Sequence, residues 1–468
     1  MQKIFHELSS LDKRCYEEFG LSEDILMEHA ANGMAAYIRA HFAQGAKIII
    51  VCGSGNNGAD GIALARQLYG DYDAKILHAK PPSSFMAKIQ IQRANNIGVE
   101  SITTLEPCDV LVDALVGTGF DGEFSEEIAA LLVKMNAHEA FKIACDIPSG
   151  VLLHGECVEE CFSAHVTLTM GALKKSLFLD ETKEFIGEIK VVDLGISRSL
   201  YEVQSNWNLL DMEDLKLPFR TKQDSHKGSY GHLALAYGSK AGASVMSASA
   251  ALCFGAGLVT LVGYENEKIA SIPHALMYAH DIPSTASAIA LGMGLGNEFS
   301  DLELENFLDN WLPIIADADI FTMSILATIL KREKVVLTPH PKEFVELLKR
   351  THIADISVSV LQKNRFEYVE AFCEKFPHIT LLLKGANVII AKGTQYYINP
   401  HGTAALAKGG SGDVLSGLIG ALLAQGYEPL KAAMSASLAH AKLATMYEGN
   451  DFSLTPDDLI ELIGKLQK

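Results

Sequence analysis

Short apolar runs that alternate with longer segments of helical pattern restrict the fold of this chain more than any other feature. In the first half the apolar runs occupy residues 46–52, 73–79, 109–115, 141–147, 164–170 and 188–194. Strands that are separated by helices pair in parallel, and helices cover both faces of a parallel sheet. The first half is therefore predicted to be an α/β domain of Rossmann-like, three-layer architecture. Its functional site should lie at the carboxyl ends of the strands.

The pattern breaks between residues 197 and 227, which form a mixed and charged region, and then resumes. Because 468 residues exceed one ordinary core, we place a domain boundary there, with domains at 1–205 and 206–468. The second series ends in a long apolar helix and predicts another α/β domain of different topology. Its expected strands are 231–239, 257–263, 288–294, 314–320, 335–340, 379–385, 387–393 and 394–399, followed by a helix over 411–426.

The charge of the chain excludes some classes of partner. Its formal net charge of −18 argues against a general nucleic-acid binder or a binder of anionic membranes. A local nest of backbone N–H groups can still hold phosphate on an acidic protein. No apolar run reaches the ~18 residues of a membrane helix, the start lacks the apolar core of a signal peptide, and the eight cysteines are scattered. We expect a cytoplasmic protein that acts on small molecules.

The stretch "IIIVCGSGNNGADG", residues 48–61, carries a glycine-rich turn directly after a strand. Gly53, Gly55 and Gly58 match the G-x-G-x-x-G template of dinucleotide-binding turns, which is a weak signal by itself. A dehydrogenase of this kind also needs an acidic residue at the end of its second strand to bind the ribose. That strand ends in "KILHAKPP", where only His78 and Lys80 are polar candidates. A dehydrogenase is therefore disfavoured.

Carboxylates follow three successive strands of the first half, at Asp60, Asp113 and Asp146. Each alone could serve as an ordinary turn or helix-cap residue. Since the carboxyl ends of parallel strands meet at one edge, the three loops should converge on one crevice. Asn57, Asp113 and Ser149 could form an oxygen cage for a monovalent cation, which leaves Asp146 as the candidate acid–base group.

Three ordered motifs, "GSGNNGADG", "VDALVGTG" and "CDIPSG", closely resemble the epimerase domain of the NAD(P)H-hydrate repair enzymes. The resemblance implies epimerisation of the hydrated nicotinamide ring and potassium bound by Asn57, Asp113 and Ser149. Departures from the family are Ala59, where glycine is usual, and His29, where asparagine is usual. The residues implied to line the substrate are Asn56, Asn57, Gly58, Ala59, Asp60, Gly117, Thr118, Gly119, Phe120, Asp121, Gly122, Glu123 and Asp146.

The most informative stretch of the second half is "ALAKGGSGDVLSGLIGALLAQG". Gly409, Gly410 and Gly412 form an anion-binding turn that opens onto a helix N-terminus, with Asp413 in the first helical turn. Asp413 could be an ordinary carboxylate of a helix N-terminus. A carboxylate beside a phosphate-binding nest is electrostatically unfavourable, however, and is expected there only if it has a catalytic role. Abstraction of a proton from a hydroxyl that attacks a phosphoryl group would be such a role. We favour this catalytic interpretation.

The turn resembles the G-x-G-D turn of the ribokinase-like superfamily. The motifs "GSYGHLALAYGSKAGA", "GAGLVTLVG", "IADAD", "LTPHPKEF" and "LLLKGANVII" narrow this resemblance to the ADP/ATP-dependent NAD(P)H-hydrate dehydratases, with departures at Tyr237 and Lys342. Asp317 and Asp319 could organise magnesium or simply end a strand, and His340 could be an ordinary turn histidine. The implied substrate contacts are Ala243, Gly294, His340 and Asp413. The implied nucleotide contacts are Lys384, Gly385, Ala386, Asn387, Val388, Gly409, Gly410, Ser411 and Gly412.

The two resemblances together imply repair of hydrated NADH and NADPH. The first domain would interconvert the R and S hydrates, and the second would dehydrate the S form with ADP, giving AMP and phosphate. Potassium and Mg²⁺ are the implied cofactors, ADP is preferred to ATP because the fused chain looks bacterial, and a homo-oligomer is expected. The alternative is a small-alcohol or vitamin kinase joined to an N-terminal module that binds a nucleotide without catalysis.

Overall fold

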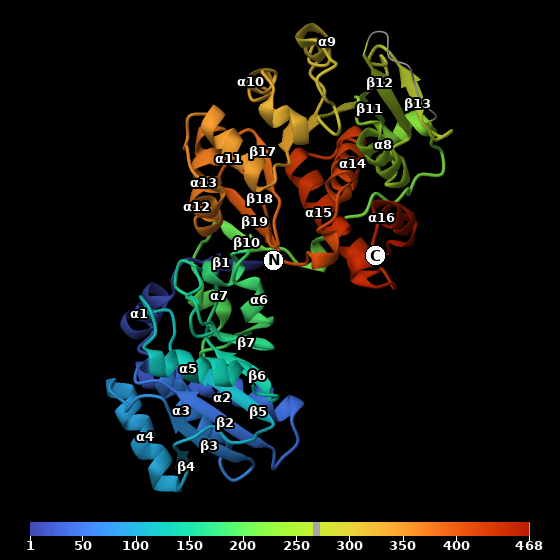
Figure 1. Cartoon of the computed structure of the whole chain (residues 1–468). Coiled ribbons are helices and arrows are strands. Elements are labelled where there is room, and N and C mark those ends of the chain that lie inside the picture. Colours follow the sequence, from blue (N-terminus) through green and yellow to red (C-terminus); the bar gives the residue numbers. More distant parts are fainter. Residues whose placement is uncertain (265–271, 468) are drawn as a thin grey trace. The chain divides into compact units, whose positions relative to one another are not determined.

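The computed structural model describes residues 1–264 and 272–467 (Figure 1). The chain divides into two compact units, Gln2–Ser205 and Asn206–Lys468, with Met1 grouped with the second. We describe each unit by itself. Among the described residues, none of the helices combines the length and the hydropathy needed to cross a membrane.

The first unit is built on a parallel sheet of strand order β4-β3-β2-β5-β6-β7-β9, and it also contains the parallel pair of β1 with β8. The predicted parallel sheet is confirmed. The elements are β1 (Gln2–Phe5), α1 (Ser9–Glu18), α2 (Glu23–His41), β2 (Lys47–Cys52), α3 (Asn56–Leu68), β3 (Asp73–His78), α4 (Phe85–Ile97), β4 (Glu100–Ile102), β5 (Val110–Ala114), α5 (Glu126–Asn136), β6 (Phe141–Cys145), β7 (Val166–Met170), β8 (Leu173–Lys174), α6 (Lys183–Ile186), β9 (Glu188–Val192) and α7 (Arg198–Tyr201).

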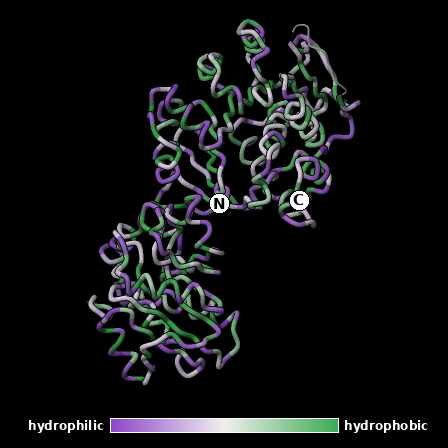
Figure 2. The backbone as a smooth tube through the Cα atoms, viewed as in Figure 1, coloured by the Kyte–Doolittle hydropathy of each residue, from purple (hydrophilic) through white to green (hydrophobic). Residues whose placement is uncertain are grey.

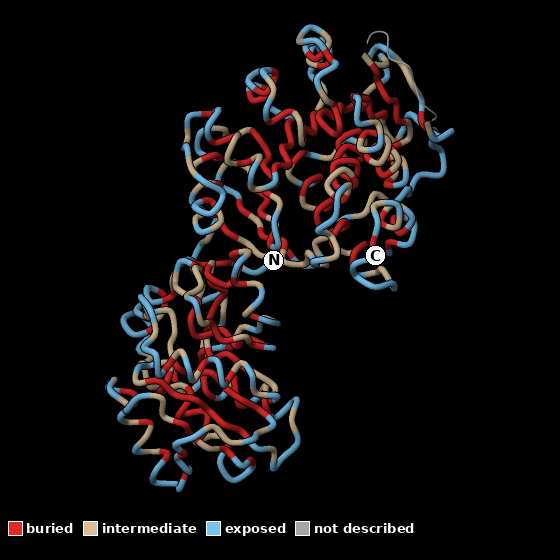
Figure 3. Tube along the Cα trace, in the orientation of Figure 1, coloured by how far each residue is buried: buried red, intermediate tan, exposed pale blue. Residues whose placement is uncertain are grey.

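Helices cover both faces of this sheet because its strands are apolar on both sides. Ile48 and Ile50 of β2 share a buried cluster with residues of α2 and α3, whereas Ile49 and Val51 share another with α5. Figure 2 shows the hydrophobic strands inside the unit, and Figure 3 shows that they are buried. The alternation of strands with helices thus produces the expected three layers.

The second unit has a mixed sheet of strand order β13-β12-β11-β14-β15-β16-β17-β18-β19-β10. Its elements are β10 (Trp207–Leu209), β11 (His232–Tyr237), α8 (Ala241–Cys253), β12 (Leu258–Gly263), β13 (Met277–Ala279), β14 (Ala288–Leu291), α9 (Asp301–Asn306), β15 (Ile314–Ala316), α10 (Leu326–Ile329), β16 (Val335–Leu337), α11 (Pro341–Arg350), α12 (Val358–Lys363), α13 (Arg365–Lys375), β17 (Thr380–Leu383), β18 (Val388–Lys392), β19 (Gln395–Asn399), α14 (Ser411–Ala424), α15 (Pro429–Thr445) and α16 (Pro456–Leu462).

The strands of the second unit change direction where their connections become short. The pairs from β11 to β17 are parallel, but β17–β18 and β18–β19 are antiparallel. A connection of only two residues, Gly393 and Thr394, joins β18 to β19, and a parallel pair would need a much longer crossover. Helix α14 is buried along most of its length and packs on α8, so that its N-terminus is fixed near the parallel strand ends.

Candidate active sites

The glycine turn of the first unit brings backbone segments closer together than a side chain would permit. A Cβ atom on Gly53 would lie 1.8 Å from the carbonyl oxygen of Leu115, and one on Gly58 would lie 2.1 Å from that of Gly53. Gly55, which precedes α3, faces open space. Ala59 has no positive φ and is buried in α3, so this departure from the family is accommodated. The turn therefore packs the start of α3 against the ends of β2 and β5.

The three residues predicted to hold a cation lie together. Asp113, which is fully buried, accepts hydrogen bonds from Oγ and N of Ser149, both at 2.7 Å. Nδ2 of Asn57 donates to the carbonyl oxygen of Val116 at 3.0 Å, and Oγ of Ser149 accepts from the N–H of Val116 at 3.1 Å. Burial raises the pKa of Asp113 to about 6, because no cationic side chain pairs with it among the described residues.

Asp146 follows β6 and has a positive φ of 72°, a conformation uncommon outside glycine. Its Oδ1 accepts a hydrogen bond from the N–H of Met170 at 3.0 Å and from Nζ of Lys174 at 2.5 Å. The side chain is 16% exposed. The carboxylate is thus oriented by two donors, and one of them, Lys174, belongs to no motif of the sequence.

A cavity of about 130 Å³ opens beside these strand ends. It is lined by Asn56 and Asp60, two of the residues implied to contact the substrate, and by residues that the motifs do not include. Among these, Asp12 of α1 accepts a hydrogen bond from the hydroxyl of Tyr201 at 2.8 Å, and Glu23 accepts one from Asn56 at 2.6 Å. Burial raises the pKa of Asp12, and burial together with the charge of Asp146 raises the pKa of Asp60 well above its ordinary value.

The glycine-rich loop after β5 reaches the site with its first residue. A Cβ on Gly117 would lie 3.4 Å from Cβ of Asn57, which places this glycine beside the predicted cation cage. Gly119, Asp121, Gly122 and Glu123 are exposed, and Thr118 and Phe120 are half-buried; none of these described residues lines the cavity. Their contact with substrate stays a prediction.

The second candidate site forms where the N-terminus of α14 meets the carboxyl ends of the parallel strands. Gly410, with a φ of 90°, precedes the helix, which begins at Ser411 and carries Asp413 in its first turn. Burial raises the pKa of Asp413 to about 6, and the neighbouring charge of Asp317 adds to the rise. Ser411 Oγ lies 3.2 Å from Nε2 of His440, a buried histidine whose pKa is lowered to about 4 by burial. The turn and the carboxylate are placed as the sequence predicts.

A buried ion pair lies beside that turn. Nζ of Lys384, the first residue after β17, donates to both carboxylate oxygens of Asp317 at 2.7 and 2.9 Å. Oγ of Ser416 also donates to Asp317, at 2.6 Å. A Cβ on Gly412 would lie 3.3 Å from Nζ of Lys384. The ammonium group is therefore near enough to the turn to attract an anion bound there.

The remaining predicted residues of this site come from other loops at the same edge. His340 precedes α11 and forms a capping box with Glu343, whose pKa burial raises to about 7. A Cβ on Gly294, which has a φ of 65°, would lie 2.9 Å from Cβ of Ala243. In the loop after Lys384, Gly385 and Ala386 are exposed, Val388 is half-buried and Asn387 is buried, while Gly409 is exposed.

The two units, each with a candidate site at the carboxyl ends of parallel strands, define a two-domain α/β enzyme. The family model described as NAD(P)H-hydrate dehydratase matches residues 234–465, and that of the YjeF-related protein N-terminus matches residues 23–176. Over 477 residues, and over the whole of both chains, the sequence is 42% identical to the bifunctional NAD(P)H-hydrate repair enzyme Nnr of Helicobacter pylori. The chain belongs to the family of bifunctional NAD(P)H-hydrate repair enzymes.

Two further proteins are similar to this chain at lower identity. The repair enzyme Nnr of Escherichia coli is 29% identical, over 92% of this chain and 87% of the relative. The ADP/ATP-dependent NAD(P)H-hydrate dehydratase of Bacillus subtilis, co-crystallised with ATP and Mg²⁺, is 28% identical with a TM-score of 0.45, covering 53% of this chain and 92% of its own. The family expected from the motifs is confirmed by the full-length relative from Helicobacter pylori.

Proposed function

We propose that the two sites act in sequence on hydrated NADH and NADPH. The first unit interconverts the R and S hydrates, and the second dehydrates the S hydrate with ADP, giving NAD(P)H, AMP and phosphate. The observation that best supports the second activity is the position of Asp413, in the first turn of α14 beside the glycine turn and the Lys384–Asp317 pair. We also propose that the protein is located in the cytoplasm and assembles as a homo-oligomer.

In the second site, Asp413 is the proposed base. It takes the proton from the hydroxyl of the hydrated ring, and the hydroxyl oxygen forms a bond to the terminal phosphorus of ADP while the bridging P–O bond breaks and AMP leaves. Phosphate then departs with the C–O bonding electrons, assisted by the ring nitrogen, and the adjacent carbon gives up a proton. A pKa of about 6 suits this role, because the carboxylate is then ionised and still basic near neutral pH.

The nucleotide phosphates are assigned to the turn of Gly409, Gly410 and Gly412, where backbone N–H groups and the helix N-terminus favour an anion. Mg²⁺ fits one of the two candidate carboxylates better than the other. Asp317 is buried and bound by Lys384 and Ser416. Asp319 is 28% exposed, accepts a hydrogen bond from the N–H of Gly296 at 2.9 Å and lies 3.6 Å from Nζ of Lys240, so that its carboxylate is the more open of the two to a magnesium–nucleotide complex. Mg²⁺ there would neutralise charge on the phosphoryl group.

In the first site, Asn57, Asp113 and Ser149 are assigned to potassium. All three offer oxygen atoms, and the fully buried carboxylate of Asp113 lacks a cationic side-chain partner among the described residues. A bound potassium ion would supply that positive charge and hold the loops that carry the site. Asp146 is the proposed acid–base group of the epimerase, since it is oriented by two donors next to the cavity.

The test uses purified full-length protein and the separated R and S hydrates of NADH, with ADP and with ATP. Dehydration of the S hydrate restores the absorbance of NADH and releases free phosphate, whereas the R hydrate should react only as fast as the first unit epimerises it. An unchanged absorbance with both nucleotides would refute the proposal. Label from the nucleotide that stays on a stable phosphorylated product would instead indicate a kinase.

A further inference from the structure

Lys174 is a buried lysine of the first unit that no sequence motif singled out. It is the last residue of β8, where Phe5 of β1 is its register partner, and its side chain is 3% exposed. Its ammonium group lies 2.5 Å from Oδ1 of Asp146 and donates to Oγ1 of Thr169 at 2.8 Å. Lysine is almost never buried to this extent without a partner. Here the partner is the proposed acid–base group.

The carboxylate of Asp146 is therefore held from two sides. Met170 at the end of β7 donates its backbone N–H, and Lys174 donates from β8 four residues later. The positive φ of Asp146 turns its backbone sharply after β6. Since β8 pairs with β1, the lysine is anchored in a regular strand pair rather than in a free loop. Its position is fixed by the fold.

The surroundings of Asp146 are otherwise acidic or neutral. The titratable groups that interact with it are Asp12 of α1, Asp60 of α3, Cys145 of β6, Lys174 of β8 and Tyr201 of α7. Among these described residues, Lys174 is the one with a positively charged side chain. Neighbouring carboxylates in a buried site do not all ionise, because each charge disfavours the next.

We propose that Lys174 is a positioning residue of the epimerase site, whose ammonium group orients the carboxylate of Asp146. The inference rests on the proposed epimerase activity of the first unit. Without the ammonium group, the carboxylate of Asp146 would lose one of its two orienting donors and keep only the N–H of Met170.

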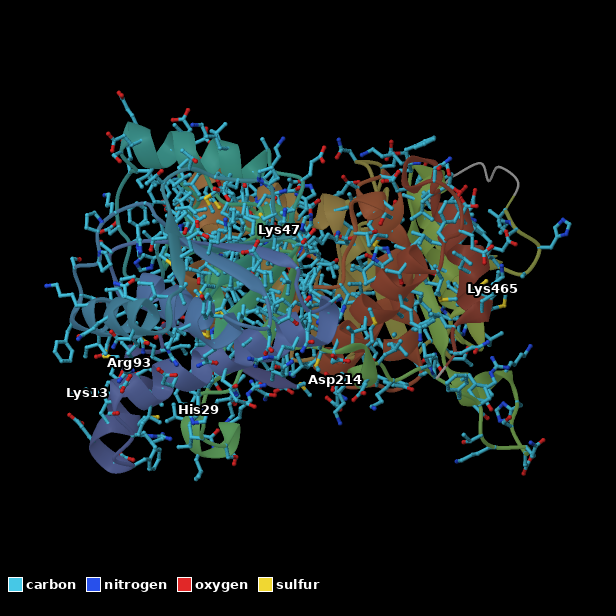
Figure 4. The ribbon with its side chains drawn as sticks, turned by 90° about the horizontal axis from the view of Figure 1, so that it is seen from below. Lys13, His29, Lys47, Arg93, Asp214 and Lys465 are labelled. Carbon is cyan, nitrogen blue, oxygen red and sulfur yellow. The ribbon has the colours of Figure 1, made fainter. Side chains whose placement is uncertain are left out.

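The experiment compares Lys174→Met, Lys174→Gln and Lys174→Arg in the full chain, with Lys47→Met as the matched control. Lys47, labelled in Figure 4, is an exposed lysine at the amino-terminal end of β2, opposite the strand ends that carry the site. Conversion of the R hydrate to the S hydrate is followed without nucleotide, from acidic to alkaline pH, after subtraction of the uncatalysed rate. Dehydration of the S hydrate by the second unit is measured on the same samples as a check of the protein.

For Lys174→Met and Lys174→Gln we expect kcat at neutral pH to fall by about tenfold or more, with little change in KM. Lys174→Arg, which keeps a cationic donor, should retain a kcat closer to that of the wild type, and Lys47→Met should change nothing. Lys174→Gln carries the test if Lys174→Met fails to fold.

A wild-type kcat in the Met or Gln variant would overturn the inference, and so would a loss that appears in KM and not in kcat. An arginine variant that loses as much kcat as the methionine variant would also overturn it. If the wild-type protein does not epimerise the hydrate, the proposed function itself is refuted. The measurement on the wild-type protein therefore distinguishes this outcome from a failure of the inference about Lys174.

Discussion

Lys384 and Asp317, 67 residues apart in the chain, form a bidentate ion pair in which the ammonium group contacts both carboxylate oxygens. The pair joins the end of β17 to the end of β15 directly beside the glycine turn of α14. Asp317 is 3% exposed and Lys384 is 22% exposed, so that solvent screens the pair only weakly. This contact holds together two strand ends that carry the proposed nucleotide site.

Removal of Lys384 should destabilise the second unit as well as weaken nucleotide binding. Lys384→Met leaves a buried carboxylate without its cation, which costs about 3–5 kcal/mol. Denaturant unfolding of the full chain should show an earlier transition for this variant. Lys334→Met, at an exposed position before β16, is the control and should unfold like the wild type. Equal stability of the two variants would contradict the structural role of the pair.

Asp413→Asn should abolish dehydration and leave epimerisation intact. Since the proposed base works only when ionised and its pKa is raised to about 6, dehydration by the wild type should fall as the pH drops through about 6. The rate of NADH restoration from the S hydrate, measured against pH, checks this expectation. We expect a loss of about 10²–10⁴-fold in the variant. A variant with wild-type kcat would exclude Asp413 as the base.

The glycines of the first turn should differ sharply in their tolerance to substitution. Gly58→Ala places a methyl group 2.1 Å from the carbonyl oxygen of Gly53 and should destabilise the first unit by several kcal/mol or prevent its folding. Gly55→Ala adds a methyl group in open space and should leave stability within about 1 kcal/mol of the wild type. Thermal unfolding of both variants measures the difference. Similar behaviour of the two would show that the close approach is unimportant.

Potassium should stabilise the first unit through Asp113. Each kcal/mol of binding free energy should raise the unfolding temperature by about 2–4 °C in a domain of this size. Scans in potassium chloride and in choline chloride at equal ionic strength separate specific binding from screening. Asp113→Asn should lose the difference between the two salts. An equal response of the wild type to both salts would argue against the cation site.

The sequence predicts the architecture and the motif residues, but it misses contacts made by residues distant in the chain. The apolar runs identify the strands of five and six residues, and also β14 to β17, which have three or four. Strands this short leave little pattern, and β1, β4, β8, β10 and β13 escape. Asp113 and Ser149 lie together as expected, since Asp113 stands near the end of β5 and Ser149 follows the neighbouring parallel strand β6.

Other partners could not be read from spacing. Asp12 belongs to a helix near the start of the chain, and Tyr201, which donates to it, belongs to a helix near residue 200. Lys174 lies in a strand too short to be detected, and only its burial identifies it. Burial of a lysine against a distant carboxylate depends on tertiary packing, which a single sequence does not display.

The division of the chain at Ser205 has a consequence for the relative amounts in which the two activities are made. Candidate residues of one activity precede the division, and those of the other follow it. Because one translation product carries both, the two enzymes are always made in a one-to-one ratio. A change in transcription of the gene therefore alters the amounts of both catalysts together and leaves their ratio unchanged.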